Sequence, residues 1–269
     1  MPDENTENYG FIRRFLAMPP DSVPKTIFIA VSICLCASMV VSAAAVALRP
    51  MQEVNAIRNM QVNILQVAGV YDPNVSVEDA FSAFEPQVLD LQEGFFTDKF
   101  DPATFDDAAA ADNPETSIEL DNDPASIGRQ AIYRTVYLLR DDAGELDKVI
   151  LPIHGYGLWS TLYGFIAVEE DANEIFGLQF YQHAETPGLG GEVDNPRWRN
   201  LWKGKQLADA DGELQITVAK TPPPAGTEYH IDALSGATLT SDGVNNLVRF
   251  WMGEEGYGPF LEKLQQGGV

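Results

Sequence analysis

The chain has 269 residues, enough for one large domain or two small ones. It carries 17 Lys and Arg against 40 Asp and Glu, a formal net charge of -23, and an acidic protein of this kind would repel DNA and RNA. We therefore exclude nucleic-acid partners. The first 49 residues are charge-balanced, so the acidic excess lies beyond them. Both cysteines, Cys34 and Cys36, lie in an apolar segment, so no disulfide is expected elsewhere.

The apolar segment covers residues 26–48, contains no charged residue and is bounded by Lys25 and Arg49. As a helix it spans roughly 35 Å, which is enough to cross a hydrocarbon core of about 30 Å. It is longer than the apolar region of a typical signal peptide, and a long polar segment precedes it. We therefore expect a permanent single transmembrane helix.

Basic residues on either side of the span predict its orientation. Three lie before it and two follow, which favours a short cytoplasmic N-terminus at residues 1–25 and places the chain from about residue 50 outside the cytoplasm. These residues are Arg13, Arg14, Lys25, Arg49 and Arg58.

The stretch 49–128 is expected to be a helical and acidic connecting region. Apolar spacing continues the helix through 49–70, where Gly69 is a natural stop. A second helix is expected at 81–91. Residues 97–128 are rich in Asp, Ala, Asn and Pro and lack periodicity, which indicates an acidic surface excursion.

From residue 129 the pattern changes to short runs rich in Val, Ile, Tyr, Phe and Leu, separated by turn residues. Several strands with a few helices predict an α+β domain over 129–269, with a mostly antiparallel sheet and flanking helices. The expected strands are 131–139, 148–153, 161–168, 175–183 and 213–219.

The segment from Asp232 to Ser241 contains Ser235, Gly236, Ala237 and Thr238, followed by Leu239 and Thr240. A threonine hydroxyl must be exposed and activated to react, and the small residues before Thr238 leave room for a phosphate. Apolar residues at helical spacing follow, with Thr240 or Ser241 as the expected N-cap. A phosphate on Thr238 would lie near the positive end of that helix, although Asp242, expected in its first turn, would repel it. The apolar helix positions are Val244, Leu247, Val248 and Trp251.

A second glycine-rich stretch runs from Glu185 through Thr186 and Gly188 to Leu189 and beyond. Its backbone path would be obstructed by side chains, so a flat ring or a phosphate could approach there. A plain glycine-rich turn is the competing interpretation. Apolar faces for an aromatic ring could come from Trp159, Tyr163 and Leu189.

Together these segments resemble the family of C subunits of Na+-translocating NADH:quinone reductases, within the wider FMN-binding domain family. The resemblance covers nearly the whole chain, and His154 is its clearest departure. The segments that carry it are 41–49, 158–160, 185–190, 195–198, 201–205 and 235–241.

The resemblance implies a covalent-FMN electron carrier, with the flavin bonded to Thr238 through a phosphoester. It implies that an FAD-dependent flavin transferase attaches the flavin, with Asp232 and the residues 235–237 as its recognition site. Glu185, Thr186, Gly188 and Leu189 would help to shape the flavin pocket. The partners would be the other membrane subunits of the complex, in a bacterial inner membrane with the soluble domain in the periplasm. Electrons would pass from NADH toward ubiquinone, coupled to Na+ export.

Three alternatives remain open on the sequence. The related G subunits of Rnf electron-transport complexes share the Thr-Pro-Gly-Leu-Gly and Ser-Gly-Ala-Thr elements. A hydrolase could use His154, His183 or His230 with a serine, but no Gly-x-Ser-x-Gly motif is present. A membrane-anchored scaffold module would explain the anchor and the charge but not the glycine-rich segments. No catalytic residue and no metal ligand is expected in this chain; in particular, Ser126 replaces the glycine that a calcium loop opening at Asp121 would need.

Overall fold

The computed structural model describes residues 18–19, 22–141, 143–224 and 226–267. The chain divides into two compact units, residues 1–57 and 58–269. The expected cytoplasmic placement of residues 1–25 depends on Arg13 and Arg14, which lie outside the described residues.

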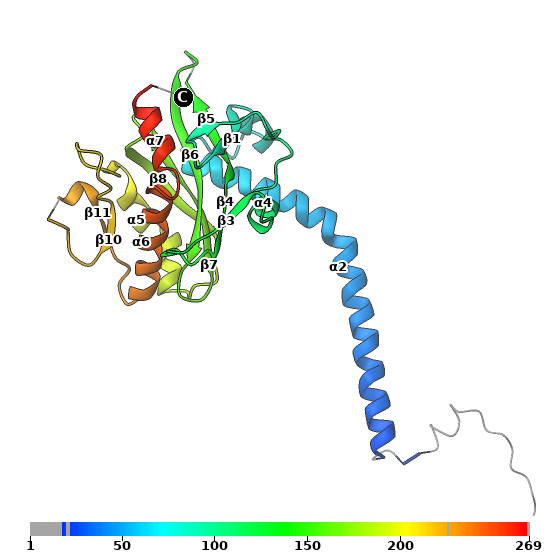
Figure 1. Ribbon diagram of the computed structural model, residues 1–269. Coiled ribbons are helices and arrows are strands. Elements are labelled where there is room, and N and C mark those ends of the chain that lie inside the picture. The colour runs from blue at the N-terminus through cyan, green and yellow to red at the C-terminus, as the bar shows by residue number, and fades with distance from the viewer. Residues whose placement is uncertain (1–17, 20–21, 142, 225, 268–269) are drawn as a thin grey trace, which may run out of the picture. The chain divides into compact units, whose positions relative to one another are not determined.

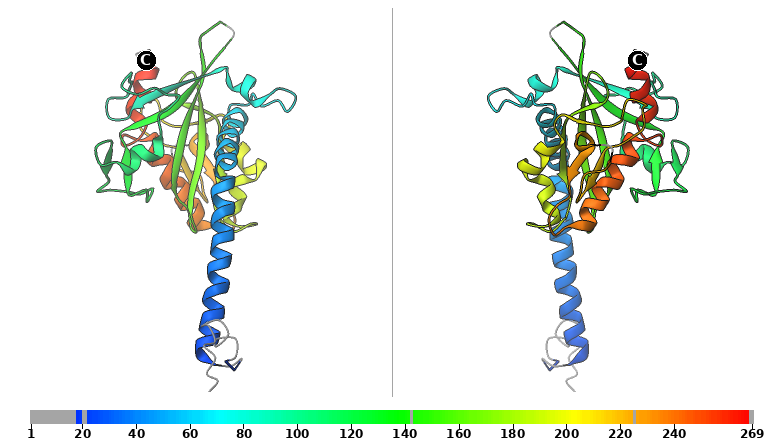
Figure 2. Two further views of the ribbon diagram at one scale, coloured as in Figure 1. Left: turned by 90° about the vertical axis from the view of Figure 1, so that its right-hand side faces the viewer. Right: turned by 90° about the vertical axis from the view of Figure 1, so that its left-hand side faces the viewer.

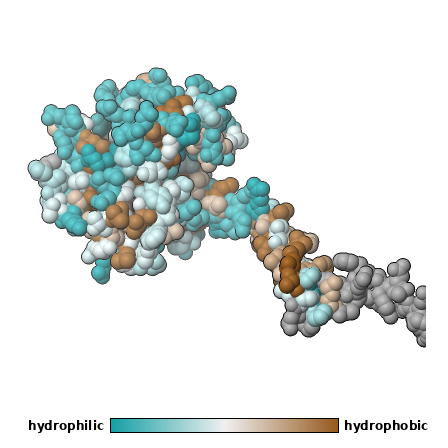
Figure 3. Space-filling view, turned by 60° about the horizontal axis from the view of Figure 1, so that its bottom comes forward, coloured by the Kyte–Doolittle hydropathy of each residue, from teal (hydrophilic) through white to brown (hydrophobic). Residues whose placement is uncertain are grey.

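A single long helix, α2 (Val23–Val67), contains the apolar segment and continues beyond it through Pro50. Among the described residues it is the one helix long and apolar enough to cross a membrane. Its apolar side chains before residue 58 are exposed, and Figure 3 shows brown patches on this helix. A protein does not leave such a surface in water, so this helix is the predicted transmembrane anchor. The predicted continuation through 49–70 is confirmed to Val67, and Gly69 follows with φ of +75°.

The unit from residue 58 is built on one antiparallel seven-stranded sheet in the order β2-β1-β5-β6-β7-β8-β9 (Figures 1 and 2). This confirms the predicted α+β class with a mostly antiparallel sheet. Its strands are β1 (Phe84–Asp90), β2 (Phe95–Phe96), β5 (Tyr133–Arg140), β6 (Leu146–Tyr156), β7 (Thr161–Glu169), β8 (Glu174–Gln182) and β9 (Lys205–Gln206).

Two of the predicted helices and strands differ in the structure. The helix expected at 81–91 is strand β1, which pairs along its whole length with β5, from Phe84 opposite Leu139 to Asp90 opposite Tyr133. A short apolar run fits either element, and the partner strand decides. The strand expected at 213–219 is reduced to the three residues of β10.

The remaining elements are short, except for α6. The acidic stretch 97–128 is not wholly irregular, because it contains α4 (Asp107–Asp112) and β3 (Ser117–Glu119). The others are α3 (Val77–Phe81), β4 (Arg129–Ala131), η1 (Gly190–Asp194), α5 (Pro196–Arg199), η2 (Asn200–Trp202), β10 (Thr217–Ala219), η3 (Thr227–Tyr229), β11 (His230–Asp232), α6 (Thr238–Met252) and α7 (Gly258–Gln265).

The sheet has a hydrophobic core on each face because side chains alternate along its strands. On one face, α6 and α7 cover residues such as Leu151 and Ile166, and Figure 1 shows both helices on that side. On the other face, the last turns of α2 bury Ile64 and Leu65 against Ile150 and its neighbours. Both faces of β6 and β7 are therefore buried, and the loop that joins these two strands contains Trp159.

Strands β5 and β6 pair only between Tyr137 and Arg140 on the β5 side, and farther along they separate. Side chains from the covering helices take up the free carbonyl groups of β6. The Tyr257 hydroxyl donates to Pro152 O at 2.7 Å, and Trp251 Nε1 donates to His154 O at 2.6 Å. The C-terminal helices are therefore tied to β6 by hydrogen bonds as well as by apolar contact.

Candidate functional site

Helix α6 begins at Thr238 itself. Its N-cap is Ala237, which offers no side-chain hydrogen bond, so the predicted capping by Thr240 or Ser241 was wrong. Thr238 is exposed. Asp242 lies beyond the first turn in which it was predicted, but it is four residues after Thr238 and therefore on the same face of the helix. The first N–H groups of a helix have no partner within it, and here no side chain caps them.

The turn before α6 is stabilised by hydrogen bonds to the Ser241 side chain. Ser241 is buried; its hydroxyl donates to Ala237 O at 2.9 Å and accepts from the Leu234 N–H at 2.9 Å. Gly236 has φ of +76°, a conformation that side chains rarely adopt. The three hydroxyl residues at the start of α6 therefore differ in exposure: Thr240 and Ser241 are buried, whereas Thr238 is exposed.

Glu185 is the residue at which the two glycine-rich segments meet. Its Oε2 accepts the Thr240 hydroxyl at 2.7 Å, and its Oε1 accepts the backbone N–H groups of Leu158 and Trp159, both at 2.9 Å. Burial by itself would raise the pKa of Glu185, but the hydrogen bonds from Trp159, Thr240 and Leu158 outweigh it and hold that pKa below its usual value. The carboxylate is therefore a stable anion inside the site.

Three glycines allow this close approach. A Cβ at Gly157 would lie 2.6 Å from Glu185 Oε1, and one at Gly190 would lie 2.6 Å from Oε2 and 2.5 Å from Thr240 Oγ1. A Cβ at Gly243, inside α6, would lie 2.6 Å from Tyr156 O. Any larger residue at these positions would push apart the elements that meet here.

The loop after β8 folds back on itself beside the segment 232–241. The Thr186 carbonyl accepts N–H groups from Leu189 at 3.1 Å and Gly191 at 2.9 Å, and Gly188 has φ of +76°. A Cβ at Gly236 would lie 3.4 Å from Leu189 Cδ2, so the two predicted segments are neighbours. The structure therefore brings Glu185 and Leu189 to the residues 236–240.

We call the place where the loop 157–160, the loop 185–191 and the start of α6 meet the junction. Several apolar side chains around this junction are exposed. Trp159 is 65% exposed, Leu239 60% and Leu189 45%, and each comes from a different one of the joined segments. Figure 3 shows apolar patches on one face of this unit among polar side chains. Exposed apolar groups gathered at one place mark a binding surface.

Asp232 and Ser235 stand at the edge of this arrangement. Asp232 ends β11; its carboxylate pairs with the buried His230 at 3.1 Å, and its carbonyl accepts Trp198 Nε1 at 2.8 Å. The Asp232 side chain is 73% exposed, and Ser235 is also exposed. Both are open to a partner rather than built into the junction.

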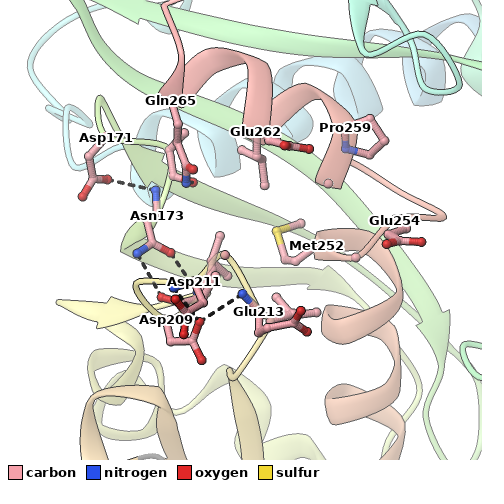
Figure 4. A pocket seen from close by; sticks show the side chains of 18 of the residues that line it. Asp171, Asn173, Asp209, Asp211, Glu213, Met252, Glu254, Pro259, Glu262 and Gln265 are labelled. Atoms are coloured by element: carbon pink, nitrogen blue, oxygen red, sulfur yellow. Dashed lines mark hydrogen bonds between the residues drawn. The ribbon is translucent and has the colours of Figure 1, made fainter.

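A pocket of about 1050 Å³ lies at the other end of α6 (Figure 4). Six acidic side chains line it, and several of them take part in the local turn, as where Asp209 Oδ1 accepts the Asp211 and Glu213 N–H groups. An anionic ligand would be repelled there. Within the part of the chain that the structure describes, no three His, Cys, Asp or Glu residues are placed to hold a metal.

Comparison with known proteins identifies the family. The C subunit of a Na+-translocating NADH-quinone reductase from Yersinia pestis is 47% identical over 255 residues, which cover 93% of this chain and 96% of that protein. The chain belongs to this C-subunit family. The Pseudomonas aeruginosa member is 46% identical over 92% of this chain and 98% of its own length. The crystal structure of NqrC from Shewanella oneidensis superposes with a TM-score of 0.72 at 38% identity, covering 78% of this chain and 99% of that one.

The FMN-binding domain model matches residues 157–253 of this member of the C-subunit family. That range starts at Gly157 and contains the Glu185 loop and all of α6. Sequence reasoning named Trp159, Glu185 and Thr240 as site residues and placed Leu158 in a segment typical of the family, but it missed Gly243. A glycine inside a helix pattern, as at Gly243, is the signal that could have indicated a close backbone approach, because glycine weakens a helix.

Proposed function

We propose that this chain is the FMN-carrying electron-transfer component of a Na+-translocating NADH:quinone reductase, with the flavin bonded to Thr238 through a phosphoester. The family membership and the match to the FMN-binding domain support the flavin and the complex. The same relatives disfavour an Rnf protein, a hydrolase or a scaffold. The single observation that carries the attachment site is the exposed threonine that opens an uncapped helix.

The residues present fit the cofactor's phosphate. A phosphodiester on Thr238 would lie beside the free N–H groups of the first turn of α6, and an anion at a helix N-terminus is favoured by both hydrogen bonds and the helix dipole. Gly236 and Ala237 present little bulk on the approach. Thr240 and Ser241 offer no free hydroxyl, since each donates to a protein oxygen at less than 3 Å.

The residues present also fit the ring. Trp159, Leu189 and Leu239 are exposed around the junction, and a flat aromatic ring would cover apolar surface that otherwise faces water. When bound, the flavin supplies the redox chemistry. This chain's residues hold the flavin at a fixed place, shield it from water, and set the charge around it through Glu185.

The covalent bond requires an attaching enzyme, and we propose an FAD-dependent flavin transferase that recognises Asp232 and the residues 235–237. The exposure of Asp232, Ser235 and Thr238 supports this, because a transferase must reach all three. The Thr238 oxygen would displace AMP from FAD, so that the P–O–P bond of FAD breaks as the phosphoester forms. We further propose that the domain is in the periplasm, that residues 1–25 are cytoplasmic and that the flavin-binding domain is residues 129–269. The helix α2 would anchor the chain in the inner membrane next to the other proteins of the complex.

The test is to express the full chain with and without a flavin transferase and to look for flavin fluorescence in the band of a denaturing gel. The wild type should fluoresce only with the transferase, and its tryptic peptide around Thr238 should gain the mass of FMN less water. Thr238→Val should give a dark band, whereas Thr238→Ser keeps the hydroxyl and should fluoresce. An unmodified peptide in the wild type made with the transferase would refute the attachment.

A further inference from the structure

The position of Glu185 raises a question of energetics. It is 5% exposed, yet it takes part in none of the ion pairs among the described residues. Burying a carboxylate is costly unless it is paired or fully hydrogen-bonded, and an amide or an apolar residue would avoid that cost. Here only neutral donors hold the anion. We therefore expect that either the negative charge or the ability of the carboxylate to accept three hydrogen bonds has a role in the site.

We propose that Glu185 is the positioning residue of the flavin site, acting through Thr240 and through the backbone of Leu158 and Trp159. This inference rests on the proposed attachment of FMN at Thr238. Glu185 would not touch the flavin, because it is only 5% exposed and its carboxylate already accepts three hydrogen bonds from the protein.

The geometry shows what the residue joins. One oxygen holds the β6–β7 loop that presents Trp159, and the other holds the first turn of α6, which presents Thr238. Glu185 itself belongs to the loop that presents Leu189. A single side chain thus fixes, relative to one another, the attachment point and two apolar side chains offered to the ring.

The arrangement also separates the two threonines of α6. Thr240 donates its hydroxyl to Glu185 and is 1% exposed, so it is withheld from modification. Thr238, two residues earlier, lies on the exposed side of the same turn. Gly157 and Gly190 provide the space that the carboxylate occupies, which indicates that the neighbouring backbone is fitted to this group.

The charge has a second consequence. A buried anion near the ring disfavours adding negative charge to it, so Glu185 should lower the flavin's reduction potential. Geometry and charge can be separated because Glu185→Gln retains the shape. A glutamine can accept from Leu158 and Trp159 with its oxygen and donate to the Thr240 oxygen with its NH2 group.

The first experiment uses the full chain in detergent, made without the transferase, so that no flavin is involved. Hydrogen–deuterium exchange is followed in the peptide that contains Leu158 and Trp159. Glu185→Ala should speed exchange there roughly tenfold to hundredfold, as expected for the loss of hydrogen bonds to a charged group. Glu185→Gln should stay within about threefold of the wild type because a neutral acceptor remains. Wild-type exchange in Glu185→Ala would overturn the proposal.

The second experiment adds the transferase. Glu185→Ala should slow flavin attachment at Thr238 by about tenfold or more, because a displacement near 1 Å is enough for such losses. Glu185→Gln should load normally and show a more positive reduction potential, which a merely structural role would not produce. Normal loading of Glu185→Ala, or an unchanged potential in Glu185→Gln, would contradict the positioning and the charge roles respectively.

A matched pair at Thr240 keeps the test decisive if Glu185→Ala fails to fold. Thr240→Val removes the link to α6 and should slow attachment, whereas Thr240→Ser retains the hydroxyl and should load as the wild type does. Equal loading of the two would overturn the proposal. If the wild type takes up no flavin on Thr238, the proposed function is wrong. Hydrogen–deuterium exchange in the flavin-free chain would still show whether Glu185 holds the loop that contains Leu158 and Trp159.

Discussion

Gly243 of α6 lies directly against the carbonyl of Tyr156 at the end of β6, so closely that a Cβ on Gly243 would stand 2.6 Å from that oxygen and 3.0 Å from the Cα of Gly157. Helix and strand end therefore meet backbone to backbone. A similar fit occurs one turn on, where a Cβ on Gly155 would stand 2.5 Å from the Cβ of Leu247. This close approach brings Thr238 to the loop that carries Trp159.

Gly243→Ala should therefore lower the free energy of unfolding by about 1–3 kcal/mol, because overpacking against backbone cannot be relieved by a side-chain rotation. On helix propensity alone the change would be stabilising by about 1 kcal/mol. The sign of the change in the unfolding free energy therefore distinguishes the two effects. Urea unfolding of the full chain in detergent measures it. The control is Asn246→Ala, a half-buried position one turn later, which should be neutral or stabilising. A stabilised Gly243→Ala would show that helix and strand are less tightly fitted.

The Tyr257 hydroxyl tests the hydrogen bonds that close the gap between β5 and β6. It is fully buried and donates to Pro152 O at 2.7 Å. Tyr257→Phe should cost roughly 1–3 kcal/mol because a buried carbonyl loses its nearest donor. Tyr71→Phe, at an exposed tyrosine, is the matched control and should change the unfolding free energy by less than about 0.5 kcal/mol. Equal effects of the two changes would mean that the gap is filled in another way.

The pH dependence of stability should depend on His154. Burial first, and the nearby positive charge of Arg134 second, lower the pKa of His154 to about 3. The unfolded chain takes up a proton near the ordinary value of about 6.5 whereas the folded chain does not, so the unfolding free energy falls as the pH drops below about 6.5. Over pH 7 to 5, where most carboxylates remain ionised, His154→Phe should reduce this fall while keeping a ring against Tyr163 and Trp251. Parallel stability curves for the two proteins would contradict the prediction.

Trp159 should matter to the flavin and not to the fold. Because its side chain is 65% exposed, Trp159→Ala should change the unfolding free energy of the flavin-free chain by less than about 0.5 kcal/mol. In the flavin-loaded chain it should make the flavin more accessible to iodide, as measured by fluorescence quenching. Val75→Ala, another exposed apolar position, should leave the quenching unchanged. Identical quenching in Trp159→Ala would place the ring elsewhere.

Gly190→Ala probes the space that holds the Glu185 carboxylate. A Cβ there would press on both Glu185 Oε2 and Thr240 Oγ1. Exchange in the peptide containing Leu158 and Trp159 should rise, as in Glu185→Ala, although less. Val75→Ala, at an exposed position outside these contacts, is the control for that peptide. Unchanged exchange in Gly190→Ala would mean that the carboxylate moves without releasing the loop.

Local patterns were enough to predict much of this chain. The apolar segment of α2, the strands β5 to β8 and the buried face of α6 all follow from periodicity, because each depends on residues close in sequence. The start of α6 was misplaced by a few residues, since Thr240 is a good cap by type but is engaged by Glu185. The strand β1 was taken for a helix because its pairing partner lies far along the chain.

The membrane anchor, the acidic charge, the two glycine-rich segments and the threonine that is the candidate for attachment can all be recognised in the amino-acid sequence. The contacts of Glu185 with Trp159 and Thr240, and the exposure of Thr238 beside a buried Thr240, are visible only in the folded chain. They could not be predicted because strand pairing and helix packing bring these residues together. Their sequence separations, 26 and 55 residues, are far beyond the range of any local pattern.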